Sequence, residues 1–135
     1  MYDENPSTRP PLTGYRGRYV QHNVIVERLP DRTRLSPARS RTLQSHSRAF
    51  EWGYAGSGPS QLGLAILLDY TREERLAPAH YQAFTRDVIA MFGESWELLT
   101  DEIDAALRRL GVTTPSGVMS RTAQERLDGR RGLDS

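Results

Sequence analysis

Alternating apolar and polar residues in the first half of the chain predict a small antiparallel sheet. Residues 15–20 and 24–29 both alternate, and the polar residues 21–23 between them are typical of a hairpin connection. Residues 49–54 alternate again and predict a further strand. Three aromatic side chains of that strand would share one face and anchor a core: Phe50, Trp52 and Tyr54.

Helical periodicity dominates the second half of the chain. Residues 62–68 are apolar at every position except Gly63, which predicts a helix buried on all sides, with Pro59 at its first position. A second helix is predicted from Pro78 to about Phe92, because its apolar residues recur at roughly helical spacing. The buried helix is expected to be the central helix of the domain.

A third helix is predicted after a short extended segment at residues 96–99. Thr100 is expected to cap its first turn, which carries two acidic residues, while its last turn carries two arginines and is followed by Gly111. Strands therefore precede helices along the chain. This order predicts an α+β fold in which a small N-terminal antiparallel sheet packs on about three helices.

The domain is expected to have an arm at each end. With 135 residues, the chain is long enough for one compact domain, which the pattern assigns to residues 14–111. Residues 1–13 are polar and rich in proline, and predict a flexible arm. Residues 112–135 predict a second arm, in which residues 122–125 resemble a capping box and indicate a short helix.

Composition removes several kinds of chemistry. The chain has no cysteine, which excludes disulfides, thiolate metal sites and cysteine nucleophiles, and no lysine, which excludes Schiff-base chemistry. No apolar run is long enough to cross a bilayer, and the N-terminus does not resemble a signal peptide, so we expect a cytoplasmic protein without membrane contact. The three histidines lack ligand spacing, and neither a metal site nor a cofactor is predicted.

The basic residues, all arginines, are concentrated in the first part of the chain. Residues 1–50 hold nine arginines and four acidic residues, whereas residues 51–110 hold five arginines and ten acidic residues. The two parts either face each other in the fold or leave a basic surface for an anionic partner. Residues 32–48 predict a long basic loop, with a short strand around Arg34 and Leu35. Six arginines are the candidates for nucleic-acid binding: Arg16, Arg18, Arg32, Arg34, Arg39 and Arg41.

The run FEWGYAGSGPSQLGLAILLDY, which starts at Phe50, carries the most specific pattern in the chain. It resembles the signature of a family of small proteins of unknown function from bacteria, archaea and their phages and plasmids. In that family an F-x-W-G-Y-x-G-S-G-P-x-Q-L-A-L-A-I-L block follows a basic, strand-rich half. This chain departs from the block at Ala55 and Gly63. The resemblance implies a mobile-element setting but no activity.

Glycines between a strand and a buried helix resemble an anion cradle, because the first N–H groups of a helix lack internal partners. In that interpretation the backbone, the aromatic rings and nearby guanidinium groups bind a phosphate-bearing ligand. The residues expected to do so are Arg48, Trp52, Tyr54, Gly56, Ser57, Gly58 and Arg86. The alternative is that the glycines only form a tight turn under packed aromatic rings.

No catalytic residues are assigned, because no nucleophile–base arrangement is recognisable in the sequence. The leading hypothesis is a non-enzymatic protein that binds a nucleic acid or nucleotide through its basic half and its glycine-rich helix start. One alternative is a protein–protein interaction module, an inhibitor of a host defence system or a component of an assembly, whose arms order on a partner. A weaker alternative is a small hydrolase using Glu51 or Asp69. Exposed sheet edges also make a homo-oligomer conceivable.

Overall fold

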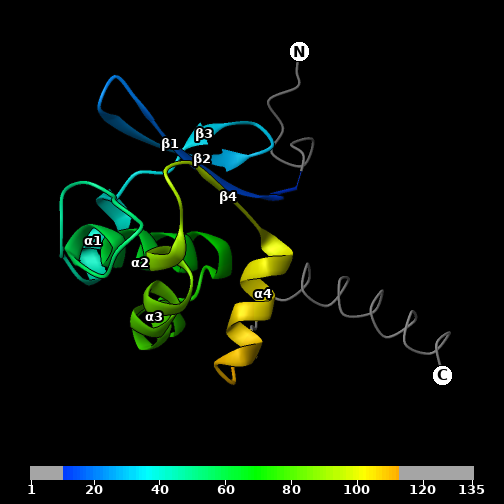
Figure 1. Cartoon of the computed structure of the whole chain (residues 1–135). Helices are drawn as coiled ribbons and strands as arrows, with labels where there is room; N and C mark the ends of the chain where they lie inside the picture. Colours follow the sequence, from blue (N-terminus) through cyan, green and yellow to red (C-terminus); the bar gives the residue numbers. More distant parts are fainter. Residues whose placement is uncertain (1–10, 113–135) are drawn as a thin grey trace, which may run out of the picture.

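A four-stranded antiparallel sheet and four α-helices make up the fold, in a computed structural model that describes residues 11–112 (Figure 1). The strand order is β3-β2-β1-β4. The strands are β1 (Gly14–Val20), β2 (Asn23–Leu29), β3 (Thr33–Arg34) and β4 (Trp96–Leu99). The helices are α1 (Ala38–Leu43), α2 (Ser57–Thr71), α3 (Leu76–Asp87), the 3-10 helix η2 (Ile89–Met91) and α4 (Thr100–Arg109). The predicted α+β class is confirmed.

The predicted hairpin is present and is tighter than expected. Val20 pairs with Asn23, so only Gln21 and His22 form the turn. Both residues have positive φ, 50° and 71°, as a two-residue turn that follows the twist of its strands requires. Strand β4 then pairs with β1 on its other side, which brings the C-terminal half of the chain into the sheet.

The strand predicted at residues 49–54 is wrong. The segment is irregular, although Phe50 and Trp52 are buried as expected, and Tyr54 is exposed instead of sharing their environment. Gly53 adopts a φ of 87°, which ends any extended run. The alternation reflects the burial of Phe50 and Trp52 in the core, and not a hydrogen-bonded strand. A spacing of two residues is compatible with either arrangement.

The long basic loop predicted at residues 32–48 contains more structure than expected. It begins with the predicted short strand, here β3 at Thr33–Arg34, and it then forms helix α1. The sequence gives no apolar stripe for this six-residue helix, because its buried member is a serine, Ser40. Leu43 of α1 packs against the hydrophobic core, and Ser40 is held by a hydrogen bond from Gln61 of α2.

The three predicted helices are confirmed with shifted ends. Helix α2 begins at Ser57, two residues before Pro59, and α3 begins at Leu76, two residues before Pro78. Prolines are tolerated throughout the first turn of a helix, because the first N–H groups have no intrahelical acceptor. The second helix also ends earlier than predicted, at Asp87, and η2 follows it.

Thr100 does not cap α4 as predicted but is its first helical residue. Its backbone N–H donates to the carbonyl oxygen of Thr13 at 3.0 Å, which joins the helix start to the chain before β1. Glu102 accepts a hydrogen bond from the backbone N–H of Leu99 at 2.8 Å and so closes the first turn.

Helix α2 is the centre of the core. Residues 61–68 are all buried, between the sheet on one side and α3 on the other, and the helices lie over one face of the sheet (Figure 1). Tyr15 of β1 is fully buried and its hydroxyl reaches Asp69 of α2, so this face of the sheet is the inner one. Within the described residues, no helix is long and apolar enough to span a membrane.

Candidate functional site

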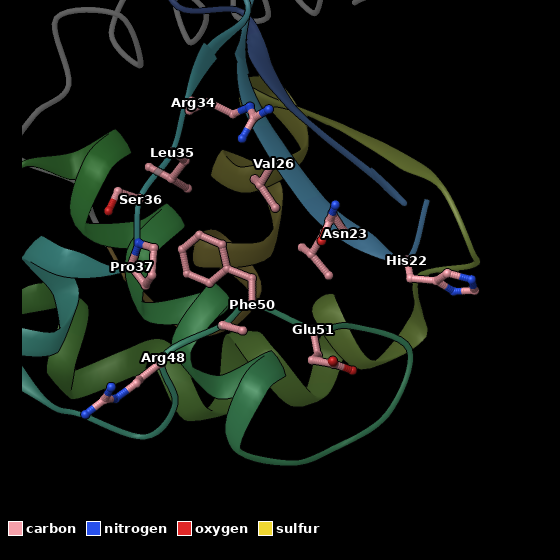
Figure 2. A pocket seen from close by; sticks show the side chains of 12 residues that line it. His22, Asn23, Val26, Arg34, Leu35, Ser36, Pro37, Arg48, Phe50 and Glu51 are labelled. Atoms are coloured by element: carbon pink, nitrogen blue, oxygen red, sulfur yellow. The ribbon is translucent and has the colours of Figure 1, made fainter. Parts of the chain in front are cut away.

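A cleft of about 530 Å³ opens between the edge of the sheet and the segment that precedes α2 (Figure 2). Its floor is apolar and is made of Val26, Leu35 and Phe50. Figure 2 shows the Phe50 ring pointing into the space. Polar and charged side chains surround the floor: His22, Asn23, Arg34, Ser36, Arg48 and Glu51.

The cleft exists because strand β3 is too short to cover the edge of β2. The N–H of Leu35 still donates to the carbonyl oxygen of Val26 at 2.9 Å, and the chain then leaves the sheet towards α1. Residues 23–25 of β2 are consequently bordered by no strand on that side. Because side chains alternate across a strand, Val24 and Val26 face the interior and border the open space.

The opposite wall is held in place by one buried amide, that of Gln61 in α2. Its Oε1 accepts hydrogen bonds from the backbone N–H groups of His46, at 2.7 Å, and Ser47, at 3.1 Å. Its Nε2 donates to Ser40 Oγ at 2.9 Å and to the carbonyl oxygen of Gln44 at 3.1 Å. The amide thereby uses its full hydrogen-bonding capacity on the segment that leads to the cleft wall.

Arg34 and Arg48 stand on opposite rims of the cleft and are both exposed. In the described part of the chain, neither guanidinium has an ion pair or a hydrogen bond. Figure 2 shows the Arg48 side chain extending outward, so contact with a ligand requires it to rotate. Glu51 is the acidic group at the same cleft.

The glycine-rich segment is packed against side chains of its own loop. A Cβ on Gly58 would lie 2.5 Å from Cγ of Glu51, and a Cβ on Gly56 would lie 2.6 Å from the ring of Tyr54. Gly58 lies close to both the side chain and the backbone of Glu51, whereas the contact at Gly56 is with the half-exposed ring of Tyr54 alone. Ser57 is exposed at the first position of α2. Anion binding by this helix start stays a prediction.

The other residues predicted to bind a ligand are dispersed. Trp52 is buried, and its Nε1 donates to the carbonyl oxygen of Glu94 at 3.1 Å. Arg86 is exposed on α3 and pairs with the adjacent Asp87 at 3.4 Å. No hydrogen bond or ion pair joins Arg86 to the glycine segment among the residues that the structure describes. Of that predicted set, only Arg48 lines the cleft.

Arg16 and Arg18 lie on the outer face of the sheet, around Glu27. Both guanidiniums approach the Glu27 carboxylate at 3.7 Å. The register places Arg34 opposite Glu27, and Glu97 opposite Arg16, so charges of opposite sign alternate across the four strands. The two arginines of β1 are therefore largely neutralised by neighbouring carboxylates.

The three remaining arginines proposed for nucleic-acid binding have separate surroundings. Arg32 is exposed in the turn before β3, with a φ of 65°. Arg39 pairs with Glu74 at 3.8 Å, and Arg41 Nε donates to Ser45 Oγ at 3.1 Å. Of the six predicted arginines, only Arg34 borders the cleft.

Asp69, one of the two carboxylates considered for hydrolysis, is engaged between the sheet and α2. Its Oδ2 accepts a hydrogen bond from the Tyr15 hydroxyl at 2.6 Å and another from Arg28 Nε at 2.9 Å. Burial, followed by the nearby Asp69 carboxylate, holds the pKa of Tyr15 well above its usual value. Asp69 does not line the cleft.

The histidines are also apart from one another. His22 is in the hairpin turn at the cleft rim, and the His46 ring is hydrogen-bonded to the Tyr81 hydroxyl at 2.5 Å. Within residues 11–112, no group of three or more histidine and acidic side chains is placed to hold a metal ion.

Several cleft residues were not predicted from the sequence. His22, Asn23 and Ser36 carry no motif, and Phe50 was expected only as a core residue. These residues lie together because β3 ends after two residues. The sequence of so short a strand does not show where it ends. The basic character of residues 32–48 was the one available signal.

Comparison with known proteins identifies one family. The family described as "Family of unknown function (DUF6166)" matches residues 14–109. This range runs from the first residue of β1 to the last residue of α4. No curated protein and no solved structure matches the chain.

Proposed function

The chain belongs to the family of unknown function DUF6166, and we propose that this member is a non-enzymatic protein that binds a phosphate-bearing ligand in the cleft beside β2. One observation carries the proposal: two exposed arginines, which form no ion pair within the described residues, line a cleft with an apolar floor. Guanidinium groups form charge-assisted, bidentate hydrogen bonds with phosphate oxygens. The aromatic and aliphatic floor supplies the surface against which an apolar part of the ligand packs.

A nucleotide fits this arrangement better than a nucleic-acid strand. The cleft volume of about 530 Å³ lies within the range of small-molecule sites. Tight binding of a nucleic acid generally involves many phosphate contacts, whereas this cleft offers two unpaired arginines. The base would lie over the apolar floor, and Asn23, Ser36 and Glu51 offer donors and acceptors for its polar edge or for the sugar hydroxyls.

A binding role is favoured over hydrolysis by the position of the candidate carboxylates. Asp69 is bound by Tyr15 and Arg28 away from the cleft. Glu51 is at the cleft, but its aliphatic part packs on Gly58. The mobile-element setting implied by the resemblance and the cytoplasmic location expected from the sequence belong to the same proposal. The alternative is a partner bound through the arms at residues 1–13 and 112–135 and the loop at residues 32–48. Residues 1–10 and 113–135 of those arms lie outside the described residues, as does the helix predicted at residues 122–125.

The test is calorimetric titration of the full chain with ATP, GTP, inorganic phosphate and a single-stranded DNA oligonucleotide. We expect a nucleotide to bind with a weak dependence on salt, because few phosphates are contacted. Arg34→Glu combined with Arg48→Glu should weaken that binding by at least about tenfold, since two charge-assisted contacts are lost.

Arg75→Glu is the matched control, because it reverses an exposed arginine at the start of α3, away from the cleft. Its nucleotide affinity should stay within about twofold of the unmodified protein. Preferential binding of the DNA with a steep salt dependence would assign the arginines to nucleic acid. An unchanged affinity in the Arg34/Arg48 double variant, or no binding of any of the four probes, would refute the cleft as the site.

A further inference from the structure

A second surface, distinct in charge from the cleft rim, lies where the tip of the β1–β2 hairpin meets the loop before α2. Tyr19, near the end of β1, is 41% exposed, and Tyr54 in the loop is 48% exposed. The Tyr54 hydroxyl lies 3.4 Å from Oε1 of Glu51. Together with Glu94, these residues form what we call the tyrosine–glutamate surface: Tyr19, Glu51, Tyr54 and Glu94.

Geometry places both glutamates near the phenol rings: the Tyr54 hydroxyl contacts Oε1 of Glu51, and the Glu94 carbonyl oxygen accepts a hydrogen bond from Trp52, on which Tyr19 packs. Partial burial, then the carboxylates of Glu51 and Glu94, raises the pKa of the Tyr19 phenol. Partial burial, then Glu51, also raises the pKa of Tyr54, with a further contribution from Tyr19. Both carboxylates therefore sit beside exposed phenol rings, and one of them, Glu51, is shared between the two rings.

No cation balances these carboxylates. Among the residues that the structure describes, neither Glu51 nor Glu94 forms an ion pair. The surface thus carries two uncompensated negative charges next to two aromatic faces. This charge disfavours nucleic acids and anionic lipids, whose phosphates would be repelled.

The exposed rings are held on a rigid support. Tyr19 packs on Trp52 with ring centroids 4.9 Å apart, and Trp52 meets Trp96 edge to face at 5.6 Å. Trp96 in turn stacks on Phe92 at 4.3 Å. On the other side, the Tyr54 ring lies against the backbone of Gly56, 2.6 Å from the place where a Cβ at that position would stand.

Because Tyr54 is half exposed, its ring buries little apolar surface and contributes little to the stability of the core. The residues concerned, Tyr54 and Gly56, belong to the W-G-Y-x-G part of the block that starts at Phe50. The local structure is thus better explained by a ring presented to a partner than by a ring needed for the core.

From these observations we infer that the tyrosine–glutamate surface binds a cationic side chain, an arginine or lysine, exposed on a partner protein. A guanidinium or ammonium group would stack on the phenol rings as a cation–π contact. Its N–H groups would donate charge-assisted hydrogen bonds to the Glu51 and Glu94 carboxylates. Glu51 borders both the cleft and this surface, so the variants that test this inference change Tyr54 and Glu94, which do not line the cleft.

The probe is a short peptide containing two arginines, compared with the same peptide in which citrulline, a neutral analogue of similar shape, replaces both. Binding to the full chain is measured by nuclear magnetic resonance titration. We expect the arginine peptide to bind at least about fivefold more tightly than the citrulline peptide, because only the first carries charge. Bound guanidinium should also lower the pKa of Tyr19 towards its usual value, since a cation favours the phenolate.

Variants separate the surface from the rest of the molecule. Tyr54→Ala with Glu94→Gln should weaken arginine-peptide binding at least about fivefold, whereas Tyr54→Phe, which keeps the ring face, should retain it within about twofold. Leu99→Ala with Glu97→Gln is the matched control, as it removes an exposed apolar side chain and a carboxylate from β4. Its affinity for the peptide should be unchanged.

Three results would overturn the inference. The first is equal binding of the arginine and citrulline peptides. The second is undiminished binding by the Tyr54/Glu94 double variant. The third is self-association of the full chain that the double variant abolishes, because a second copy of this chain would then be the occupant in place of another protein.

Discussion

At the residue scale, Gly63 and Thr85 mark the closest approach of helices α2 and α3. A Cβ on Gly63 would lie only 2.1 Å from Oγ1 of Thr85. The absence of a side chain at Gly63 leaves the space that Thr85 occupies across the contact. The Thr85 hydroxyl is buried and has no hydrogen-bond partner among the described residues. A buried hydroxyl without a partner costs folding free energy.

Thr85→Val should therefore stabilise the protein by about 1 kcal/mol, because it replaces the unpaired hydroxyl by a methyl group of similar size. Urea unfolding measures the change. The matched control is Thr71→Val in α2, whose hydroxyl is equally buried but donates to the carbonyl oxygen of Leu67 at 2.7 Å. That variant should lose about 1 kcal/mol. Equal effects of the two substitutions would contradict the assignment of Thr85 as unpaired.

A second residue-scale prediction concerns alkaline pH. Because the pKa of Tyr15 is raised in the folded state, this phenol keeps its proton when the unfolded chain, with a pKa near 10.0, loses it. Above about pH 10 the unfolded state then binds fewer protons than the folded state. The stabilisation that this phenol contributes is therefore fully present below about pH 10 and is lost as the pH rises through the raised pKa of the folded state.

The measurement is urea unfolding at about pH 8 and about pH 11 for the unmodified protein and for Tyr15→Phe. The loss of stability between the two pH values should be smaller in Tyr15→Phe, which has no proton to lose at this position. The same variant should be less stable at pH 8, since the 2.6 Å hydrogen bond to Asp69 is removed. An identical pH dependence in both proteins would contradict this account.

At the scale of elements, helix α1 depends on a side chain that is far from it in sequence. A helix of six residues is too short to be stable alone, and Leu43 is the apolar residue of α1 that packs on the core. Gln61 of α2 compensates by hydrogen bonding to Ser40 within α1 and to the backbone that follows it.

Gln61→Leu should destabilise the protein by about 3 kcal/mol or more, because several buried donors and acceptors of residues 40–47 lose their partner. Hydrogen exchange should accelerate most at the amides of His46 and Ser47. Gln82→Leu is the control, since Gln82 is exposed and makes a single long contact of 3.4 Å. A uniform loss of protection over the whole chain would count against a local role for Gln61.

At the scale of the whole molecule, the uneven charge along the chain is used in part to join its two halves. Arg28 of the basic half meets Asp69 of the acidic half at 2.9 Å, and Arg39 meets Glu74 at 3.8 Å. The first pair is largely shielded from solvent, whereas both side chains of the second are more than half exposed. Shielded pairs are screened less by salt than exposed ones.

Asp69→Asn should therefore lower the free energy of unfolding by about 2 kcal/mol, since Arg28 would keep its charge without a carboxylate. Glu74→Gln should cost less than about 1 kcal/mol. Urea unfolding at low and high salt separates the two pairs, because the effect of Glu74→Gln should vanish at high salt and that of Asp69→Asn should persist. An equal loss of stability in Asp69→Asn and Glu74→Gln would contradict this prediction, because both ion pairs would then behave as exposed surface pairs.

Much of the fold could be predicted because its long helices and its hairpin are encoded locally. The apolar run around Leu64 and the charge pattern of α4 depend on neighbours within a few residues. The cleft could not be predicted, since its walls come from residues 22–26, 34–37 and 48–51, which only chain topology brings together. The alternation at residues 49–54 misled because burial of Phe50 and Trp52 does not require strand pairing.

The sequence alone determined the α+β class, the central buried helix, the absence of cysteine and lysine chemistry and the uneven distribution of charge. These properties follow from composition and short-range periodicity. The tertiary structure decided which arginines are neutralised, as Arg16 and Arg18 are by Glu27, and which have no ion pair within residues 11–112, as is the case for Arg34 and Arg48 at the cleft. The reason is physical: the effect of a charge depends on which groups the fold places within a few ångströms of it, and that proximity is not written in sequence spacing.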